Sequence, residues 1–492
     1  MKRSVAAHLA ALSIDATSDE PLYRQLYFAI REAILSGRLK PGQRLPASRS
    51  LAADLKLSRN TVVTAFDQLV AEGYIDGRTG AGTYVSSTLP EELLNARMAG
   101  NGKASHKSRR RGPSKRGAYL ASIGGRGATR PRAFSPGLPE LVEFPFEEWG
   151  RLLGRRWRRP PRSFLVGNDP IGYAPLRNAI ATYLGAARAV RCSPDQVIIV
   201  SGAQQALDLT ARVLIDPGDT VWMEEPGFHG MRGALLAAGA KLAPVPVDDE
   251  GLSVTAGQEI APEARLACVS PSHQYPLGIT MSLPRRLELL EWARVADAFI
   301  LEDDYDSEYR YRGRPLAALQ GLDEEGRVIY IGTMSKVMFP GLRIGYMVVP
   351  DDLVDAFRAV RILIDTHPSS IAQAALADFI TEGFLSAHIR RMRALYNARQ
   401  TVLIEAIRQE LDGFLSINPE DAGMHLLAGL PAEVDDAALS RSARAADVEA
   451  PPISVFYDGP PKRRGLLLGY AGFGDREIRR GVETLGRVIS HA

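Results

Sequence analysis

The chain has 492 residues, 45% hydrophobic and 24% charged, which is an ordinary globular composition with room for about three domains. Its two cysteines, Cys192 and Cys268, exclude a disulfide scaffold and a cysteine-based zinc site, and they suit a reducing cytoplasm. No run approaches the roughly 20 apolar residues of a membrane span. The short apolar run near the N-terminus is interrupted by His8 and does not fit a signal peptide. We therefore expect a cytoplasmic protein.

Charge is unevenly distributed along the chain. The net charge of +3 divides into +2 for residues 1–100, +10 for residues 101–132, which contain no acidic residue, and −9 for the remainder. A basic N-terminal part, residues 1–132, followed by an acidic remainder favours nucleic-acid binding through the N-terminal part.

The first part of the chain predicts three short helices and a hairpin. Apolar residues at helical spacing predict helices over residues 21–36, 46–57 and 59–72, and Ser58 is a suitable N-cap for the third. Two strand-like runs around a glycine-rich tip predict a hairpin over residues 74–85. This order is typical of a winged helix-turn-helix, while the pattern alone also allows a small helical domain with another role.

The same segment resembles the GntR family over residues 18–86. The matching stretches include Leu-Pro-Ala-Ser-Arg at 45–49, Leu-Ser-Arg-Asn-Thr at 57–61 and Glu-Gly-Tyr at 72–74. The resemblance implies an α+β winged helix-turn-helix that binds double-stranded operator DNA, with a recognition helix in the major groove. The positions that it implies as DNA contacts are Arg49, Arg59, Asn60 and Thr61, with Thr79 and Gly80 in the wing.

Residues 87–132 are expected to form a basic, flexible linker. Gly, Ser, Lys and Arg dominate, and apolar periodicity is lost apart from a possible short helix at residues 91–98. The basic run 107–116 could contact DNA phosphates or could keep the linker extended, and the sequence does not decide between these roles.

Residues 133–492 form the third segment, in which apolar runs alternate with helical patterns. The runs expected to be strands are residues 197–200, 220–223, 266–270, 298–301, 328–331 and 346–349. This alternation predicts a mostly parallel α/β sheet, whose binding site should lie at the carboxyl ends of the strands.

Lys336 follows one of these runs, with Thr333 and Ser335 just before it and Arg343 seven positions later. A lysine amine whose pKa is lowered forms a Schiff base with an aldehyde. Hydroxyl groups and a guanidinium suit a phosphate dianion. An aldehyde and a phosphate on one molecule suggest pyridoxal 5′-phosphate (PLP).

Two further strand ends fit the same cofactor. Ser-Gly-Ala-Gln-Gln at 201–205 precedes a helical pattern, so its N–H groups can meet a phosphate at a helix N-terminus. Asp303 follows the run 298–301, and a carboxylate there can keep the pyridine nitrogen protonated. These motifs, in this order, resemble the fold-type-I aminotransferases.

That resemblance implies an α/β PLP-dependent transferase of fold type I, with a small C-terminal α/β subdomain. It implies that Lys336 is the catalytic residue and carries the cofactor, and that Asp303 pairs with the ring nitrogen. Tyr305 would hydrogen-bond the ring hydroxyl, and Phe228 would stack on the ring. The residues implied to bind the phosphate are Ala203, Gln204, Thr333, Ser335 and Arg343. The neighbouring Asp304 and Asp306 are expected to be N-caps or surface charges.

Two strings depart from the aminotransferase pattern. Tyr275 stands where aminotransferases commonly have the Asn that bonds the ring hydroxyl, and His273 or Gln274 could substitute for it. Near the C-terminus, many aminotransferases have an arginine that clamps the substrate carboxylate, but the comparable string has Leu467 and no cation. These departures argue against efficient transamination of amino acids.

Both halves together resemble the MocR/GabR-type transcriptional regulators, in which a GntR winged helix is fused to a fold-type-I PLP domain. Ser-His-Gln-Tyr-Pro at 272–276 and the stretches 302–311 and 388–393 carry this resemblance. It implies a PLP-dependent regulator that senses an amine, an amino acid or PLP itself. It also implies a homodimer whose partners exchange domains. We expect no metal site. The alternative is an active aminotransferase with an accessory DNA-binding domain.

Overall fold

The computed structural model divides the chain into two compact units, residues 1–112 and 113–492. The residues that it describes are 14–15, 18–78, 82–88, 112–123, 130–313 and 316–490. None of the described helices is both long and apolar enough to cross a membrane.

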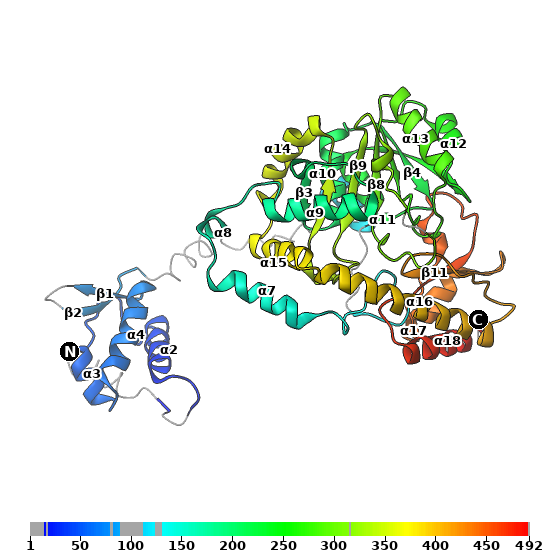
Figure 1. Cartoon of the computed structure of the whole chain (residues 1–492). Helices are drawn as coiled ribbons and strands as arrows, with labels where there is room; N and C mark the ends of the chain where they lie inside the picture. The colour runs from blue at the N-terminus through cyan, green and yellow to red at the C-terminus, as the bar shows by residue number, and fades with distance from the viewer. Residues whose placement is uncertain are drawn as a thin grey trace. The chain divides into compact units, whose positions relative to one another are not determined.

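The N-terminal unit contains helices and one hairpin, coloured blue in Figure 1. Its elements are α2 (Leu22–Leu35), α3 (Ser48–Asp54), α4 (Arg59–Ala71), β1 (Ile75–Arg78) and β2 (Gly82–Val85). The two strands pair antiparallel, with Ile75 opposite Val85. Leu26, Leu51 and Leu69 from the three helices are buried in one core. The winged helix-turn-helix prediction is confirmed.

Local sequence explains how the helix-turn-helix begins and ends. The Ser58 hydroxyl accepts a hydrogen bond from the backbone N–H of Thr61 at 3.1 Å, which caps α4 as predicted. Helix α3 is shorter than expected because Lys56 has a φ of 55°, so the chain leaves the helix before Leu57.

The larger unit is built on an eight-stranded sheet with the order β3-β10-β9-β8-β7-β4-β5-β6. The strands are β3 (Val197–Val200), β4 (Thr220–Glu225), β5 (Lys241–Asp248), β6 (Gly251–Leu252), β7 (Leu266–Val269), β8 (Phe299–Asp304), β9 (Val328–Thr333) and β10 (Gly345–Val348). Strands β5, β4, β7, β8 and β9 are parallel, whereas β10 is antiparallel to both β3 and β9. The predicted runs all form strands, and the fold is the expected one.

Helices cover both faces of the sheet because alternate strand residues point to opposite sides. Val197 and Ile199 of β3 pack in one core with α7, α9 and α15, whereas Ile198 and Val200 pack in another with α10, α11 and α14. The helices of this lobe are α7 (Phe146–Arg158), α8 (Arg162–Val166), α9 (Ala174–Arg188), α10 (Ala203–Leu214), α11 (His229–Ala238), α12 (Val254–Ile260), α13 (Leu283–Val295), α14 (Val354–Asp365) and α15 (Ser370–Thr381). Short 3₁₀ turns are η1 (Pro194–Gln196), η2 (Gln320–Leu322), η3 (Pro340–Leu342), η4 (Asp351–Leu353) and η5 (Ile453–Phe456).

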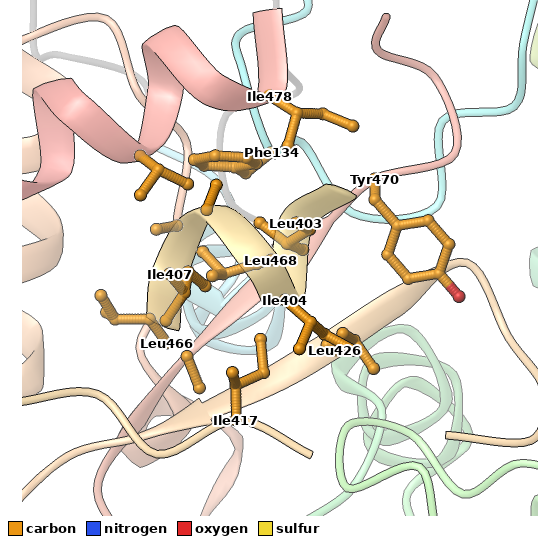
Figure 2. Packing of buried hydrophobic residues seen from close by; sticks show 14 of the residues in the cluster. Phe134, Leu403, Ile404, Ile407, Ile417, Leu426, Leu466, Leu468, Tyr470 and Ile478 are labelled. Atoms are coloured by element: carbon orange, nitrogen blue, oxygen red, sulfur yellow. The ribbon is translucent and has the colours of Figure 1, made fainter. Parts of the chain in front are cut away.

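A small C-terminal lobe, residues 411–490, packs on the end of the 27-residue helix α16 (Phe384–Glu410). Its elements are β11 (His425–Gly429), α17 (Asp436–Ala445), β12 (Gly465–Gly469) and α18 (Asp475–Ile489). Figure 2 shows Leu403 and Ile407 of α16 packed against Leu426, Leu468 and Ile478 of these elements. The first turns of α16 are buried in the sheet lobe instead, so this helix joins the two lobes (Figure 1).

One helix, α6 (Lys115–Ile123), was not predicted and lies in the segment expected to be a linker. It has no buried residue, contacts α11, and begins where the Ser114 hydroxyl accepts from the N–H of Gly117 at 3.0 Å. Its weak apolar pattern explains why the sequence did not indicate it. The helix expected at residues 91–98 lies outside the described residues.

Candidate functional site

The carboxyl ends of β8 and β9 and the N-terminus of α10 surround a cavity of about 350 Å³. The residues that line it are Pro136, Gly137, Ala203, Gln204, Phe228, Tyr275, Asp303, Tyr305, Thr333, Ser335, Lys336, Arg343 and His425. The nine residues that the aminotransferase resemblance implied for the cofactor are all in this wall, whereas His273 and Gln274, the proposed substitutes for the missing Asn, are not. The fold therefore brings together side chains that are up to 140 positions apart in the chain, from Ala203 to Arg343.

Lys336 lies three residues beyond the end of β9 and reaches across the cavity. Its Nζ donates to the carbonyl of Gly137 at 2.8 Å, and the Tyr309 hydroxyl donates to its backbone carbonyl at 3.1 Å. Burial lowers the pKa of Lys336, although Asp306 and Asp303 oppose the shift. A lysine with a lowered pKa is available as a nucleophile toward an aldehyde.

Asp303, near the end of β8, has an unsatisfied oxygen. Its Oδ1 is buried and has no hydrogen-bond partner among the described residues. Burial, reinforced by the charge of Asp304, raises the pKa of Asp303 to about 7, while Lys336 opposes the shift. An unpaired buried acceptor is costly. A protonated pyridine nitrogen in the cavity would supply the missing donor, so this residue fits PLP.

A cradle for an anion lies at the N-terminus of α10. Gly202 precedes the helix with a φ of 116°, and a Cβ at this position would lie 3.3 Å from Nη2 of Arg343. Glycine therefore lets the guanidinium approach the free N–H groups of the helix. Thr333, which pairs with Gly345 beside Gly202, also lines the cavity, and its hydroxyl accepts from the N–H of Ser335 at 3.1 Å. A helix N-terminus, hydroxyls and a guanidinium together fit a phosphate group.

Aromatic rings form the apolar part of the wall. Phe228, which precedes α11, and Tyr275 are edge to face, with ring centroids 5.8 Å apart at 87°. Tyr275 is also edge to face with Tyr305, at 6.0 Å. Burial raises the pKa of the Tyr275 hydroxyl.

His273, one of the two substitutes proposed for the missing Asn, reaches Tyr305. Its Nδ1 lies 3.0 Å from the Tyr305 hydroxyl and 3.1 Å from Oδ2 of Asp306, and its Nε2 lies 3.0 Å from Oε2 of Glu420. Burial alone would lower the pKa of His273, but Asp306 and Glu420 raise it to about 10. Gln274 is not available, because its amide donates to Glu224 and to backbone carbonyls.

The expectation that Asp304 and Asp306 are N-caps or surface charges is wrong. Both side chains are buried, at 4% and 1% exposure. Asp304 accepts from Nε of Arg188 at 2.8 Å and from the Tyr330 hydroxyl at 2.6 Å, while Asp306 faces His273. These partners come from distant segments, so the local sequence gives no sign of them.

Comparisons with known proteins agree with the geometry of this cavity. Residues 159–485 match the family aminotransferase class I and II, and residues 22–85 match the bacterial regulatory proteins of the gntR family. The chain is 46% identical over 482 residues to the probable rhizopine catabolism regulatory protein MocR of Rhizobium meliloti, with 96% of this chain and 95% of that one covered. The chain belongs to the MocR-type transcriptional regulators. The alternative, an active aminotransferase with an accessory DNA-binding domain, is not favoured.

Other relatives of this MocR-type chain divide between regulators and enzymes. It is 29% identical to the HTH-type pyridoxine biosynthesis transcriptional regulator PdxR of Corynebacterium glutamicum, with 98% and 99% of the two chains covered. The kynurenine aminotransferase of Pyrococcus horikoshii, solved with PMP, is 28% identical with a TM-score of 0.68, over 81% of this chain and 99% of that one. The family and the fold support PLP as the cofactor of this chain. Bound PLP supplies an electrophilic carbon for primary amines.

The helix-turn-helix of this MocR-type chain presents the predicted DNA-contacting side chains. Arg59 and Asn60 are exposed in the first turn of α4, next to Thr61, and Arg49 is exposed at the start of α3. Thr79 and Gly80 lie outside the described residues.

Sequence reasoning missed three members of the cavity wall, Pro136, Gly137 and His425. Gly137 supplies the carbonyl that holds Lys336. His425, the first residue of β11, is buried, and burial lowers its pKa well below the usual value, with His273 and Lys336 adding to the shift. A lone histidine at the head of an apolar run carries no signal, because only the fold brings the C-terminal lobe to Lys336.

The described part of the cavity wall has no arginine at the position where many aminotransferases clamp a substrate carboxylate. Leu467 and the rest of β12 are buried and apolar, as the sequence indicated. Among the described residues, Lys336 and Arg343 are the only cationic side chains in the wall apart from any charge on His425.

Proposed function

We propose that this chain is a PLP-dependent regulator that binds operator DNA through residues 18–86 and responds to a small primary amine through residues 133–492. Residues 87–132 connect the two parts. The observation that carries the proposal is that Lys336 and Asp303, whose Oδ1 has no hydrogen-bond partner among the described residues, line one cavity. The described part of its wall has a phosphate cradle and no cation other than Lys336, Arg343 and any charge on His425. Such a site suits cofactor and amine binding better than rapid turnover of amino acids.

Nine of the wall residues have a proposed role toward the cofactor. Lys336 bonds to it covalently, Asp303 pairs with the ring nitrogen, Tyr305 bonds the ring hydroxyl and Phe228 stacks on the ring. The residues proposed to hold the phosphate are Ala203, Gln204, Thr333, Ser335 and Arg343. The unpaired Oδ1 of Asp303 and the close approach of Arg343 to Gly202 support these roles.

The DNA side of the proposal involves Arg49, Arg59, Asn60 and Thr61, together with Thr79 and Gly80 in the wing. Arginine can bridge O6 and N7 of guanine, so Arg59 is proposed to read a base edge. We propose a homodimer with exchanged domains. Its two winged helix-turn-helix domains would bind two half-sites at a fixed spacing.

Regulation requires that the ligand bind two conformations with different affinities. An amine that replaces Lys336 on the cofactor would release the lysine amine into the cavity. The charge beside Asp303 and Asp306 would then change, at the point where the sheet lobe meets the C-terminal lobe. A change in the shape of residues 133–492 would begin at this boundary between the two lobes.

PLP itself is the second candidate effector. Without the cofactor, Asp303 keeps a buried unpaired oxygen, so filling the cavity changes the stability of the site. The relatives are named for different roles, rhizopine catabolism and pyridoxine biosynthesis, so they do not assign one effector to this chain.

Titration of the PLP-loaded protein with amines and amino acids tests the proposal. The absorbance of the cofactor should change with some amines, and operator binding measured with the same amines should change in parallel. Steady-state transamination with a kcat of about 1–10³ s⁻¹, together with operator binding indifferent to cofactor and amine, would contradict it.

A further inference from the structure

A second cavity, of about 270 Å³, lies outside the cofactor site. Its wall comes from the C-terminal part of α9, from the segment 307–313 after β8 and from the first turns of α16. The described residues of this wall include one acidic residue, Glu308, and four arginines, Arg188, Arg310, Arg390 and Arg393. We call it the arginine cavity. It shares no residue with the described wall of the cofactor cavity, and the roles proposed above do not use it.

Two of these arginines have their guanidinium groups held by the chain. Nε of Arg188 donates to the buried carboxylate of Asp304 at 2.8 Å, so this charge is neutralised. Arg393 is held without being neutralised, because its Nε and Nη2 donate to the backbone carbonyl of Glu308 at 3.0 and 2.7 Å. A carbonyl carries no net charge. The charge of Arg393 therefore remains available to a ligand.

Arg310 and Arg390 have no carboxylate within hydrogen-bond distance among the described residues. Nε of Arg310 is buried without a partner, and the carboxylate of Asp421 lies 3.8 Å from its Nη2, which is too far for a hydrogen bond. Arg390 is exposed and forms neither an ion pair nor a hydrogen bond with the described part of the chain. A buried donor without an acceptor is costly. The arginine cavity therefore contains donors that need an acceptor from a ligand.

The N-terminus of α16 adds further donors. Ser386 is the third residue of this helix and lines the cavity, and Arg390 and Arg393 follow it four and seven positions later, on the same face. The helix has no side-chain cap and no acidic residue in its first turn. The N–H groups of a first turn have no acceptor within the helix and carry a partial positive charge. This end of the cavity therefore favours an anion.

The balance of charge indicates which anion. Three guanidiniums that are not neutralised face one carboxylate, that of Glu308, so the described wall has an excess of two positive charges. Glu308 already accepts from the Tyr183 hydroxyl at 3.1 Å. A phosphate monoester carries close to two negative charges at neutral pH and has three acceptor oxygens, whereas a carboxylate has one charge and two oxygens. Arginine forks bind phosphate in a bidentate manner.

The size of the cavity limits the rest of the ligand. Its 270 Å³ is slightly below the roughly 300–1,000 Å³ of most small-molecule pockets. Ala186, Ala187 and Ile389 supply an apolar part of the wall. A phosphate group with a short carbon chain fits these dimensions.

We propose that the arginine cavity is a second ligand site, which binds the phosphate group of a small phosphate monoester through Arg310, Arg390 and Arg393. The proposal does not depend on the function proposed above. The site has a direct connection to the cofactor cavity, because Tyr309, between the wall residues Glu308 and Arg310, donates to the backbone carbonyl of Lys336 at 3.1 Å.

Calorimetric titration of the full-length protein at low ionic strength tests the site. The probes are glycerol 3-phosphate, glycerol and acetate. PLP is first fixed in the protein with borohydride, so that the phosphate cradle of the cofactor cavity is filled. The Kd of glycerol 3-phosphate should be about tenfold or more below that of acetate, and glycerol should not bind. If PLP cannot be fixed, the proposed function fails, and the variants below still test the arginine cavity on the protein without cofactor.

Variants with opposite expected effects locate the binding. Arg310→Gln should raise the Kd of glycerol 3-phosphate by about tenfold, and Arg390→Gln, an exposed position that does not disturb the core, by about threefold. Glu308→Gln removes a negative charge and keeps an acceptor for Tyr183, so it should lower the Kd by about threefold. Arg408→Gln, exposed in the last turn of α16 and outside the cavity, is the matched control and should leave the Kd unchanged.

Three results would overturn the proposal. One is a Kd that is unchanged in both Arg390→Gln and Glu308→Gln, which does not require Arg310→Gln to fold. Another is an equal rise of the Kd in Arg390→Gln and Arg408→Gln, which would show a general effect of net charge. The third is acetate that binds as tightly as glycerol 3-phosphate, or no binding of glycerol 3-phosphate at all.

Discussion

The imidazole of His273 lies 3.0 Å from the carboxylate of Glu420, across the boundary between the sheet lobe and the C-terminal lobe. The other ring nitrogen lies 3.0 Å from the hydroxyl of Tyr305 in the cavity wall. The close packing depends on Gly423, which has a φ of 100° and where a Cβ would lie 2.1 Å from Cε1 of His273. One side chain therefore connects the cofactor cavity with the C-terminal lobe.

This connection predicts a pH dependence of stability. Asp306 and Glu420, against the effect of burial, raise the pKa of His273 from 6.5 to about 10. A pKa raised by folding stabilises the protein fully below the unfolded value of 6.5, and the stabilisation is lost as the pH rises through about 10. Thermal unfolding should show a larger fall in Tm between these values for the wild type than for His273→Gln. Parallel curves for the two proteins would show that the ring is not charged in the native state.

Asp303 is predicted to hold the ring nitrogen through its charge. Asp303→Asn keeps the shape but loses the charge-assisted hydrogen bond, so the Kd for PLP should rise by about 10- to 100-fold, the equivalent of ~1.5–3 kcal/mol. Titration of the cofactor-free protein with PLP measures this. Glu224→Gln is a control, because it changes a buried carboxyl that does not line the cavity. Equal Kd values for Asp303→Asn and the wild type would remove Asp303 from the cofactor contacts.

Lys336 is predicted to be the covalent attachment point. The PLP-loaded protein should be yellow, and borohydride should fix the cofactor to the peptide that contains Lys336. Lys336→Ala should bind PLP without fixation. Peptide mapping by mass spectrometry is the measurement, and reduced cofactor found on another lysine in the wild type would refute the assignment.

Arg59 is predicted to contribute sequence-specific contacts to DNA. Arg59→Ala should lose ~1–3 kcal/mol of specific binding and relax discrimination at one base position. An operator selected from random duplexes with the full-length protein serves as the probe. Arg294→Ala, an exposed residue of α13 paired with Glu291, is a matched control. A uniform loss on all sequences with a smaller salt slope would indicate a phosphate contact instead. Unchanged DNA binding by both Arg59→Ala and Arg49→Ala would refute the proposal that the helix-turn-helix contacts DNA through these two residues.

The sequence predicted the elements that carry strong local patterns. The run Val197–Val200 is apolar at every position and forms β3, and Ser58 caps α4 through a bond that its own hydroxyl makes. Strand β5 (Lys241–Asp248) was not predicted because Pro244 and Pro246 interrupt its pattern. Strand pairing tolerates them near the edge of the sheet.

The site was predicted where a residue carries a motif and missed where only the fold supplies the neighbours. Lys336 and Arg343 lie in one short stretch, and both are in the cavity wall. Asp304 was placed on the surface because its buried partner Arg188 is 116 positions away. His425 was missed because β11 approaches the sheet lobe only after α16 has positioned the C-terminal lobe.

The most direct test of the account measures operator affinity of the full-length protein in three states: without cofactor, with PLP, and with PLP and a responding amine. The account predicts that affinity changes between states by about 5- to 150-fold, the usual range of allosteric coupling. It also predicts that Lys336→Ala, which cannot exchange the amine in the same way, loses the response to the amine. Superimposable binding curves in all three states, with wild type and Lys336→Ala indistinguishable, would contradict the claim that the cavity controls DNA binding.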